Sequence, residues 1–321
     1  MKKVLIALLF LAMFFSVSFA AEVSLDPSFI KKLNVSGSLR LRYSALEAGN
    51  QMDAFSLSRA RIKITGDLAS DCSFLVQPDF SALSTGGNLA LADAYVEFKN
   101  IYKNVKSLKI GQFLVPFGYD SGKYKTIYGT NLNPYYYNTI ISARDYGIRA
   151  SGIVPLLSNI YFDGAIVNGT GGVETNKTKD LAGRINFKND ILDLGVSGYA
   201  GKATAASLSK GDLGVDLEIK ANPCLIVAEY LNGENTLATA QITDTYLQLS
   251  CLINNNYEPL IKYEEYDPNI NQTNNKVNTY TLGLNYVFDS NRKLLVNYNI
   301  NAEETAQINN NSLLVELQMQ I

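Results

Sequence analysis

The chain has 321 residues, with 28 basic and 30 acidic side chains and a formal net charge of −2 at pH 7. It contains 20 Tyr and 23 Gly but neither His nor Trp. Without histidine there is no Ser–His or Cys–His nucleophile pair and no imidazole metal ligand, which removes most hydrolase mechanisms. The balanced charge also argues against nucleic acid as a partner, because nucleic-acid-binding domains carry a basic excess.

The N-terminal segment has the pattern of an export signal. Lys2 and Lys3 precede an apolar run from Val4 to Phe15, and small residues end the segment at Ala20. This pattern predicts a cleaved secretory signal peptide over residues 1–20 and leaves 21–321 as one domain. That domain has no apolar run near the roughly 20 residues that a membrane-spanning helix needs, so membrane insertion would require a closed barrel.

The rest of the chain alternates apolar and polar residues in segments separated by turn residues, which is typical of membrane-spanning β-strands. The alternation and the turn residues predict an all-β fold, a transmembrane antiparallel barrel of sixteen strands. The predicted strands are 33–44, 53–68, 71–80, 89–99, 105–113, 145–154, 157–168, 179–188, 191–203, 209–220, 223–234, 242–253, 256–267, 277–288, 292–303 and 311–321.

Short and long connections alternate along the chain, so they fall on opposite rims of such a barrel. An even strand number places both termini on the short-turn rim, as in outer-membrane barrels. The longest connection, Leu114 to Arg144, is rich in Gly, Pro, Asn and Tyr. Because a loop of this length is usually functional, we predict that it folds into the barrel after the fifth strand and narrows it.

The strand patterns also assign the two faces of the wall. In the last strand Leu313, Val315 and Leu317 alternate with Ser312, Glu316 and Gln318. The apolar set is expected to meet lipid and the polar set to meet water. A basic side chain on the lipid face would cost about 2–4 kcal/mol at the membrane midplane, so charged residues are assigned to the lumen.

Basic residues in the lumen are the candidate functional groups, because a charged pore wall attracts ions of opposite sign. Carboxylates at Asp93, Glu97, Asp212, Asp216, Glu218, Glu229 and Glu264 suggest a separate acidic wall. Two interpretations remain: the basic residues favour anions, or lumenal charges only pair across strands. The candidate pore-lining and anion-attracting residues are Arg40, Arg42, Arg59, Arg61, Lys63, Lys123, Lys125, Arg149 and Arg184.

The chain contains three cysteines, Cys72, Cys224 and Cys251, so at most one intramolecular disulfide can form. Cys224 begins one predicted strand and Cys251 ends the next, so the two could face each other. The favoured interpretation is three unpaired cysteines acting as small apolar residues, with a Cys224–Cys251 disulfide as the alternative.

Several segments resemble one protein family. They are FSLSRARIKITGDL (55–68), LADAYVEF (91–98), LKIGQFLVPFG (108–118), VNGTGG (167–172), DLAGRINF (180–187) and IKYEEYDP (261–268). On these segments the chain resembles the phosphate-selective porin O and P family, trimeric outer-membrane porins of Gram-negative bacteria. The resemblance implies sixteen strands, a loop inside the pore, and matches of Arg59 and Arg61 to paired basic positions of the second strand.

Together these observations predict an outer-membrane porin for passive diffusion of small hydrophilic solutes, with anions favoured and phosphate among them. No enzyme activity, cofactor or metal is expected; the expected partners are solutes, outer-membrane lipid and two further copies of the chain. One alternative is a non-conducting structural or adhesive barrel plugged by the long loop. Another is a barrel enzyme, which the absence of histidine disfavours.

Overall fold

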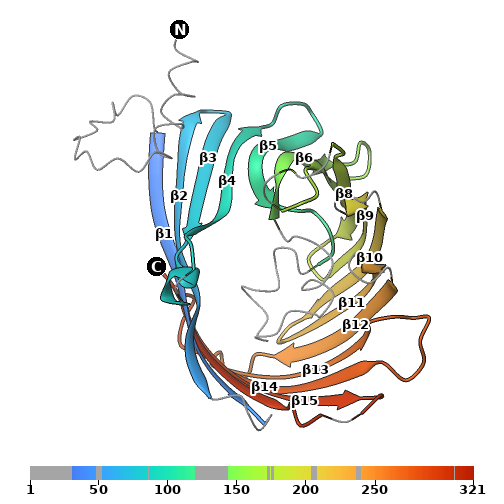
Figure 1. Ribbon diagram of the computed structural model, residues 1–321. Helices are drawn as coiled ribbons and strands as arrows, with labels where there is room; N and C mark the ends of the chain where they lie inside the picture. Colours follow the sequence, from blue (N-terminus) through green and yellow to red (C-terminus); the bar gives the residue numbers. More distant parts are fainter. Residues whose placement is uncertain are drawn as a thin grey trace.

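The computed structural model describes residues 31–47, 53–85, 87–119, 144–171, 174, 177–203, 208–235, 240–306 and 308–321. Sixteen antiparallel strands pair in sequence order, and β1 pairs with β16 to close a barrel (Figure 1). The strands are β1 Lys31–Leu46, β2 Ala54–Ala69, β3 Cys72–Asp79, β4 Ala90–Lys99, β5 Val105–Leu114, β6 Arg144–Ile153, β7 Ile160–Val167, β8 Asp180–Lys188, β9 Leu192–Ala203, β10 Leu208–Ala221, β11 Cys224–Asn235, β12 Ala240–Cys251, β13 Tyr257–Asp267, β14 Val277–Val287, β15 Arg292–Glu303 and β16 Ser312–Gln320.

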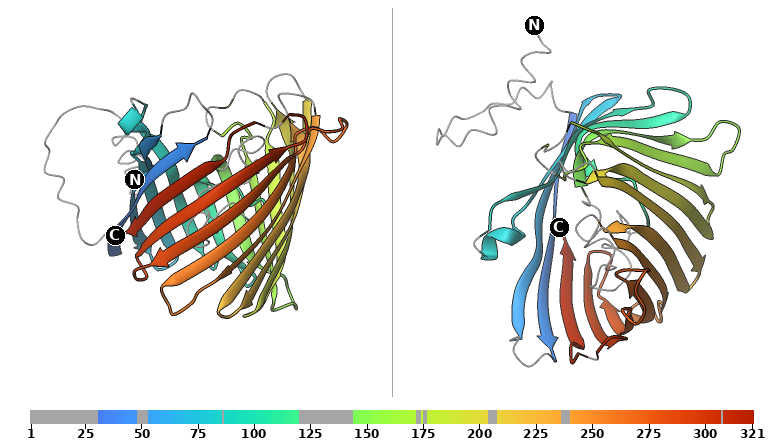
Figure 2. Two further views of the ribbon diagram at one scale, coloured as in Figure 1. Left: turned by 90° about the horizontal axis from the view of Figure 1, so that it is seen from below. Right: turned by 45° about the vertical axis from the view of Figure 1, so that its right-hand side comes forward.

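The predicted number and order of strands are confirmed. The strands are inclined to the barrel axis (Figure 2), as closing a sheet into a barrel requires. A short 3-10 helix, Ser81–Thr85, lies in the connection between β3 and β4. Among the described residues, no helix is long and apolar enough to cross a membrane.

The largest boundary error lies at β7, which was predicted from residue 157 but begins at Ile160. Residues 154–160 form a tight turn, in which Leu157 donates to the Val154 carbonyl and Val154 donates to the Ile160 carbonyl. Leu156 has a φ of +68°, so the backbone leaves the extended conformation there. The prediction placed the connection at residues 155–156 but not its continuation to Asn159, because an apolar residue such as Leu157 is also typical of a strand.

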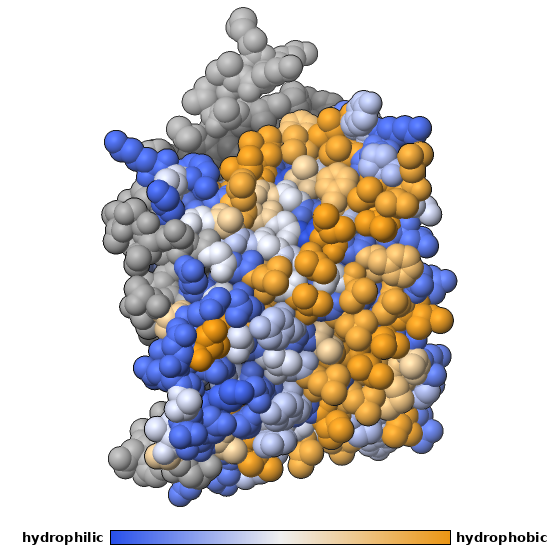
Figure 3. Space-filling model, turned by 90° about the vertical axis from the view of Figure 1, so that its right-hand side faces the viewer, coloured by the Kyte–Doolittle hydropathy of each residue, from blue (hydrophilic) through white to orange (hydrophobic). Residues whose placement is uncertain are grey.

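The two faces of the wall reverse the pattern of a water-soluble protein. Outward side chains such as Ile185 and Leu247 are 58% and 53% exposed, whereas the inward carboxylates of Asp180 and Glu316 are fully buried. A broad band of apolar residues covers the outer face of the molecule, beside a hydrophilic margin (Figure 3). This arrangement fits a wall with lipid outside and polar groups inside, and it confirms the predicted faces of β16.

The favoured interpretation of the cysteines was wrong, because Cys224 and Cys251 form a disulfide. The register places the two residues directly opposite each other on β11 and β12. Both lie on the short-turn rim of the barrel, at the end of this antiparallel pair away from the connection between β11 and β12. Cys72 is the free cysteine of the three.

Candidate functional site: the barrel lumen

The inner face of β1 and β2 carries a cluster of basic residues. Arg40 lies directly opposite Arg59, and Arg61 and Lys63 lie opposite Ser38 and Ser36. Alternation on the two strands directs these side chains to the same face, and pairing of the strands brings them together. Like charges this close repel each other unless carboxylates offset them.

Glu316 of β16 supplies one such carboxylate. The Arg42 guanidinium lies 2.8 Å from Glu316 Oε2, and Arg40 Nη1 lies 3.9 Å from Oε1. Ser58 Oγ also donates to Glu316 Oε2 at 2.6 Å. Ser58 is the extra residue of a β-bulge, since the register shifts between Arg40 and Leu41. The bulge therefore adds a donor to the carboxylate that serves both arginines.

The other members of the cluster differ in how they are paired. Arg61 Nε lies 2.6 Å from Asp79 Oδ2 at the end of β3. Neither Arg59 nor Lys63 makes an ion pair with any described residue. The charges of these two side chains are therefore the least compensated in the cluster.

The basic residues farther along the wall, on β6 and β8, are ion-paired. Arg149 Nε donates to Asp163 Oδ1 at 2.8 Å, and its Nη1 donates to the Leu114 carbonyl at 2.6 Å. Arg184 bridges two carboxylates: its Nε lies 2.9 Å from Asp216 Oδ2 and its Nη2 lies 3.1 Å from Asp193 Oδ1. Guanidinium groups held in this way are rigid parts of the wall.

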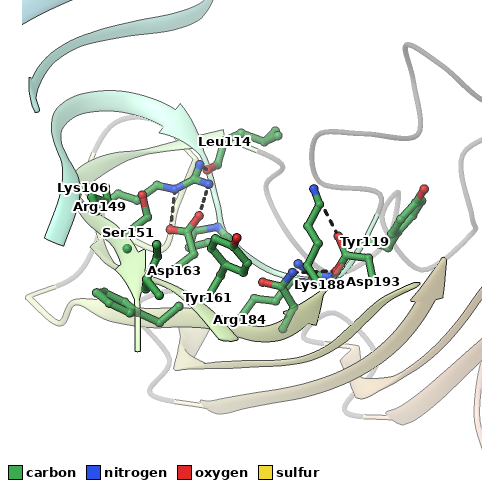
Figure 4. Close-up of a pocket in the computed structure, with 16 residues that line it drawn as sticks. Lys106, Leu114, Tyr119, Arg149, Ser151, Tyr161, Asp163, Arg184, Lys188 and Asp193 are labelled. Atoms are coloured by element: carbon green, nitrogen blue, oxygen red, sulfur yellow. Dashed lines mark hydrogen bonds and ion pairs between the residues drawn. The ribbon is translucent and has the colours of Figure 1, made fainter. Parts of the chain in front are cut away.

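A cavity of about 530 Å³ lies beside these two arginines, between the inner wall and the segment after β5. Figure 4 shows Arg149 joined to Asp163, and Lys188 reaching toward Asp193. Leu114, Pro116, Gly118 and Tyr119 line its other side. Most of its wall residues lie near the short-turn ends of β5 to β9, so the cavity lies in the part of the lumen near that rim.

Residues 115–119 leave β5 and pack against the inner wall. Val115, Phe117 and Tyr119 are 2%, 1% and 3% exposed. Phe117 contacts the ring of Tyr199 edge-on, with 6.5 Å between ring centroids. Phe117 lies in a cluster of buried apolar residues on the inner face that includes Leu231 and Ile242, and this cluster holds the start of the long connection on the wall.

Hydrogen bonds to wall side chains fix the backbone of the same segment. The Gly118 amide donates to Ser197 Oγ at 3.0 Å, and the Tyr119 amide donates to Glu229 Oε1 at 2.6 Å. The Tyr119 hydroxyl donates to Glu218. Three neighbouring strands, β9, β10 and β11, therefore hold two residues of this segment.

A glycine of β10 makes the close approach possible. A Cβ atom on Gly214 would lie 2.5 Å from Ser197 Oγ and 3.6 Å from the ring of Phe117. A larger side chain would displace the serine that accepts the Gly118 amide proton. Gly214 is therefore part of the seat for this segment.

The structure brings Arg40, Arg42, Arg59, Arg61 and Lys63 together on one part of the lumen and places Arg149 and Arg184 on another. Lys123 and Lys125 lie outside the described residues, as do residues 120–143 of the long connection and the predicted signal peptide. The predicted separation of basic and acidic walls holds only in part. Four arginines have a carboxylate as an immediate neighbour, whereas Glu218, Glu229 and Glu264 lie on β10, β11 and β13, away from the basic cluster on β1 and β2.

Sequence reasoning missed three of these carboxylates, Asp79, Asp163 and Asp193. Asp163 lies opposite Arg184 of β8 and, on its other side, opposite Ser151 of β6, two residues from Arg149. Exact register would have revealed such pairs, but predicted strand ends are uncertain by about two to four residues. The anchoring role of Ser197 has no sequence signal, because it depends on the path of the segment after β5.

Comparisons with known proteins agree with this geometry. Solved structures of similar fold include OmpF of Salmonella typhi in complex with daunomycin (TM-score 0.69, 13% identity, covering 92% of this chain and 99% of that one). An anion-selective porin from Comamonas acidovorans has a TM-score of 0.67 at 14% identity, with 90% and 99% of the chains covered. The trimer form of in-vitro folded OmpT, an outer membrane protein of Vibrio cholerae, has a TM-score of 0.65 at 12% identity, with 90% and 99% covered.

At these identities the solved structures establish the fold alone. No significant match was found among curated proteins. The family model described as phosphate-selective porin O and P matches residues 33–240, which run from β1 to the first residue of β12. Because this match covers more than half of the chain, the protein belongs to the phosphate-selective porin O and P family.

Proposed function

We propose that the protein is a bacterial outer-membrane porin through which small hydrophilic solutes diffuse passively, with anions favoured over cations. The observation that carries the proposal is a closed sixteen-strand barrel with apolar residues outside and charged residues inside. Family membership and the barrel fold both point to a channel in the outer membrane. The protein acts by conduction and catalyses no reaction.

The anion preference rests on the uncompensated part of the basic cluster. An arginine paired with a carboxylate contributes little electrostatic potential at the position of a passing ion, because the contributions of the two opposite charges nearly cancel. Arg59 and Lys63 are the members of the cluster that make no ion pair within the described lumen. They therefore attract anions most strongly, and phosphate is one candidate solute.

The long connection after β5 acts as the constriction of the channel. Its start, residues 115–119, packs on the β9–β11 wall, and this placement supports an inward path. Lys123 and Lys125 would then add positive charge to the narrow part. The working unit is a homotrimer, which the trimer form of a porin-like neighbour supports, and residues 1–20 are removed on export.

The test is the reversal potential of the refolded mature chain in a planar bilayer under a potassium chloride gradient, compared with Arg59→Gln. One charge about 7 Å from the path of an ion contributes about 0.6 kcal/mol in water. Since it acts with opposite sign on anions and cations, its removal changes the permeability ratio about sevenfold without screening and about two- to threefold in about 0.1 M salt. The control is Arg292→Gln, which changes the net charge equally but on the solvent-exposed short-turn rim, where Arg292 pairs with Asp289.

Discrete open steps with an anion preference that falls in Arg59→Gln, but not in the control, would support the proposal. Steps with a cation preference that neither substitution changes would leave a porin without the anion mechanism. Folded protein that gives no steps would favour the alternative of a plugged structural or adhesive barrel.

A further inference from the structure

Three adjacent turns on the short-turn rim carry exposed apolar side chains. Ile101 and Tyr102 lie between β4 and β5, Leu156 and Leu157 between β6 and β7, and Ile191 between β8 and β9. We call these five residues the apolar lip. Backbone hydrogen bonds join the turns, since Ile153 donates to the Asn104 carbonyl and Lys188 donates to the Asn159 carbonyl. The lip is therefore one continuous stretch of the rim.

Most other turns on this rim are polar at their tips. The turn between β14 and β15 is Asp289-Ser290-Asn291, and β10 joins β11 through Asn222-Pro223. Within the lip, by contrast, Tyr102 is 73% exposed and Leu156 is 103% exposed. Turns elsewhere on this rim also carry exposed apolar residues, namely Leu252 (37%), Ile253 (48%) and Phe288 (46%), but Tyr102, Leu156 and Ile191 of the lip are exposed to a greater degree.

Leu156 is held in a conformation that leucine rarely adopts. Its φ is +68°, and four of the other non-glycine residues with positive φ are asparagines: Asn100, Asn254, Asn255 and Asn274. A positive φ is unfavourable for a branched apolar residue. Because the side chain is fully exposed, the backbone hydrogen bonds of the turn are what hold this conformation. The turn therefore displays a leucine at its tip, pointing away from the barrel.

The apolar lip continues the lipid-facing band of the same strands. Phe98 of β4, Ile185 of β8 and Leu194 of β9 all point outward and are 38%, 58% and 44% exposed. Lys103 adds an exposed positive charge between Tyr102 and β5, and it makes no ion pair with a described residue. The turns 100–104 and 154–159 contain no acidic residue, and the third turn of the lip has one, Asp190 beside Ile191. Apolar side chains beside a lysine suit the boundary between acyl chains and anionic headgroups.

We propose that the apolar lip inserts into the membrane leaflet at the short-turn rim and binds anionic phospholipid there. Tyr102 would lie at headgroup level, Leu156 and Leu157 would reach the acyl chains, and Lys103 would contact the phosphate. The barrel would then be held at a fixed depth on the β4–β9 side. This proposal is independent of what the channel conducts.

The absence of tryptophan from the chain gives a direct test. Leu156→Trp and Tyr102→Trp each place a single fluorophore in the lip, and Ser290→Trp is the matched control on a polar turn of the same rim. The full mature chain carrying each substitution is refolded into phosphatidylcholine vesicles containing phosphatidylglycerol. Quenching is then compared between brominated acyl chains and aqueous iodide.

We expect Leu156→Trp and Tyr102→Trp to show blue-shifted emission, quenched by brominated lipid and shielded from iodide, with the reverse for Ser290→Trp. Lys103→Gln should lower the preference of the protein for spin-labelled phosphatidylglycerol over phosphatidylcholine by up to about fivefold. Iodide quenching of both lip variants equal to that of the control would overturn the proposal. So would a blue shift that already appears in detergent and grows with protein concentration, because it would assign the lip to contact with a second copy.

Discussion

Replacing Phe117 with alanine should free the segment that begins the long connection. Burying Val115, Phe117 and Tyr119 contributes about 1.5–3 kcal/mol each, and the three hydrogen bonds of Gly118 and Tyr119 add about 1 kcal/mol each. Ordering the five residues costs about 1–2 kcal/mol per residue. The balance is a few kcal/mol in favour of the anchored state, whereas truncating a buried Phe costs about 3–5 kcal/mol. Phe117 alone therefore decides whether the segment stays on the wall.

The assay is single-channel recording of Phe117→Ala, with Phe98→Ala as the control. Phe98 points outward and is 38% exposed, so its truncation leaves the lumen unchanged. We expect Phe117→Ala to broaden the distribution of open-state conductances and raise the open-channel noise, with the heat stability of the barrel nearly unchanged. Conductance and noise identical to those of the control would refute the reasoning that this anchor shapes the channel.

Two further predictions concern pairs that the structure identifies. Asp79→Asn should release Arg61 from its carboxylate partner and raise the anion-to-cation permeability ratio about two- to threefold; a ratio equal to that of Asp289→Asn would contradict this. Cys251→Ser should lower the free energy of unfolding by up to about 3–4 kcal/mol, the loop-entropy value for a separation of 27 residues. Urea titrations would measure it, with the folded fraction read from the difference in gel mobility between heated and unheated samples. Cys72→Ser should have no such effect and is the control.

The sequence predicted the barrel well because its signal is repeated in every strand. Each strand must place apolar residues outward and polar residues inward, so sixteen weak patterns supported one another. Where a local pattern was ambiguous, the predicted boundary was in error: the strand was predicted to begin at Leu157, yet the turn continues to Asn159. The favoured interpretation also missed the disulfide, since its formation depends on the register that places Cys224 opposite Cys251.

The lumen was harder to predict because pairing depends on positions within one or two residues. Alternation correctly directs Arg149 and Arg184 inward, but it does not show that Asp163, Asp193 and Asp216 lie beside them. A shift of one residue would turn any of these groups to the opposite face. The wall residues on which residues 115–119 pack are still harder to predict from sequence. Their identity depends on the path of the segment after β5 toward strands far along the chain.

The pairing pattern separates two roles that a count of charges would combine. Removing one partner of a largely buried ion pair leaves an uncompensated charge, which strongly destabilises the protein. Arg149 and Arg184, each bound to carboxylates, are therefore needed for the shape of the wall and contribute little to its net field. Arg59 makes no ion pair with a described residue, so its loss removes charge from the lumen and leaves no carboxylate behind. The nearly neutral total charge of −2 is consequently no guide to selectivity, which follows from the few lumenal charges that lack a partner.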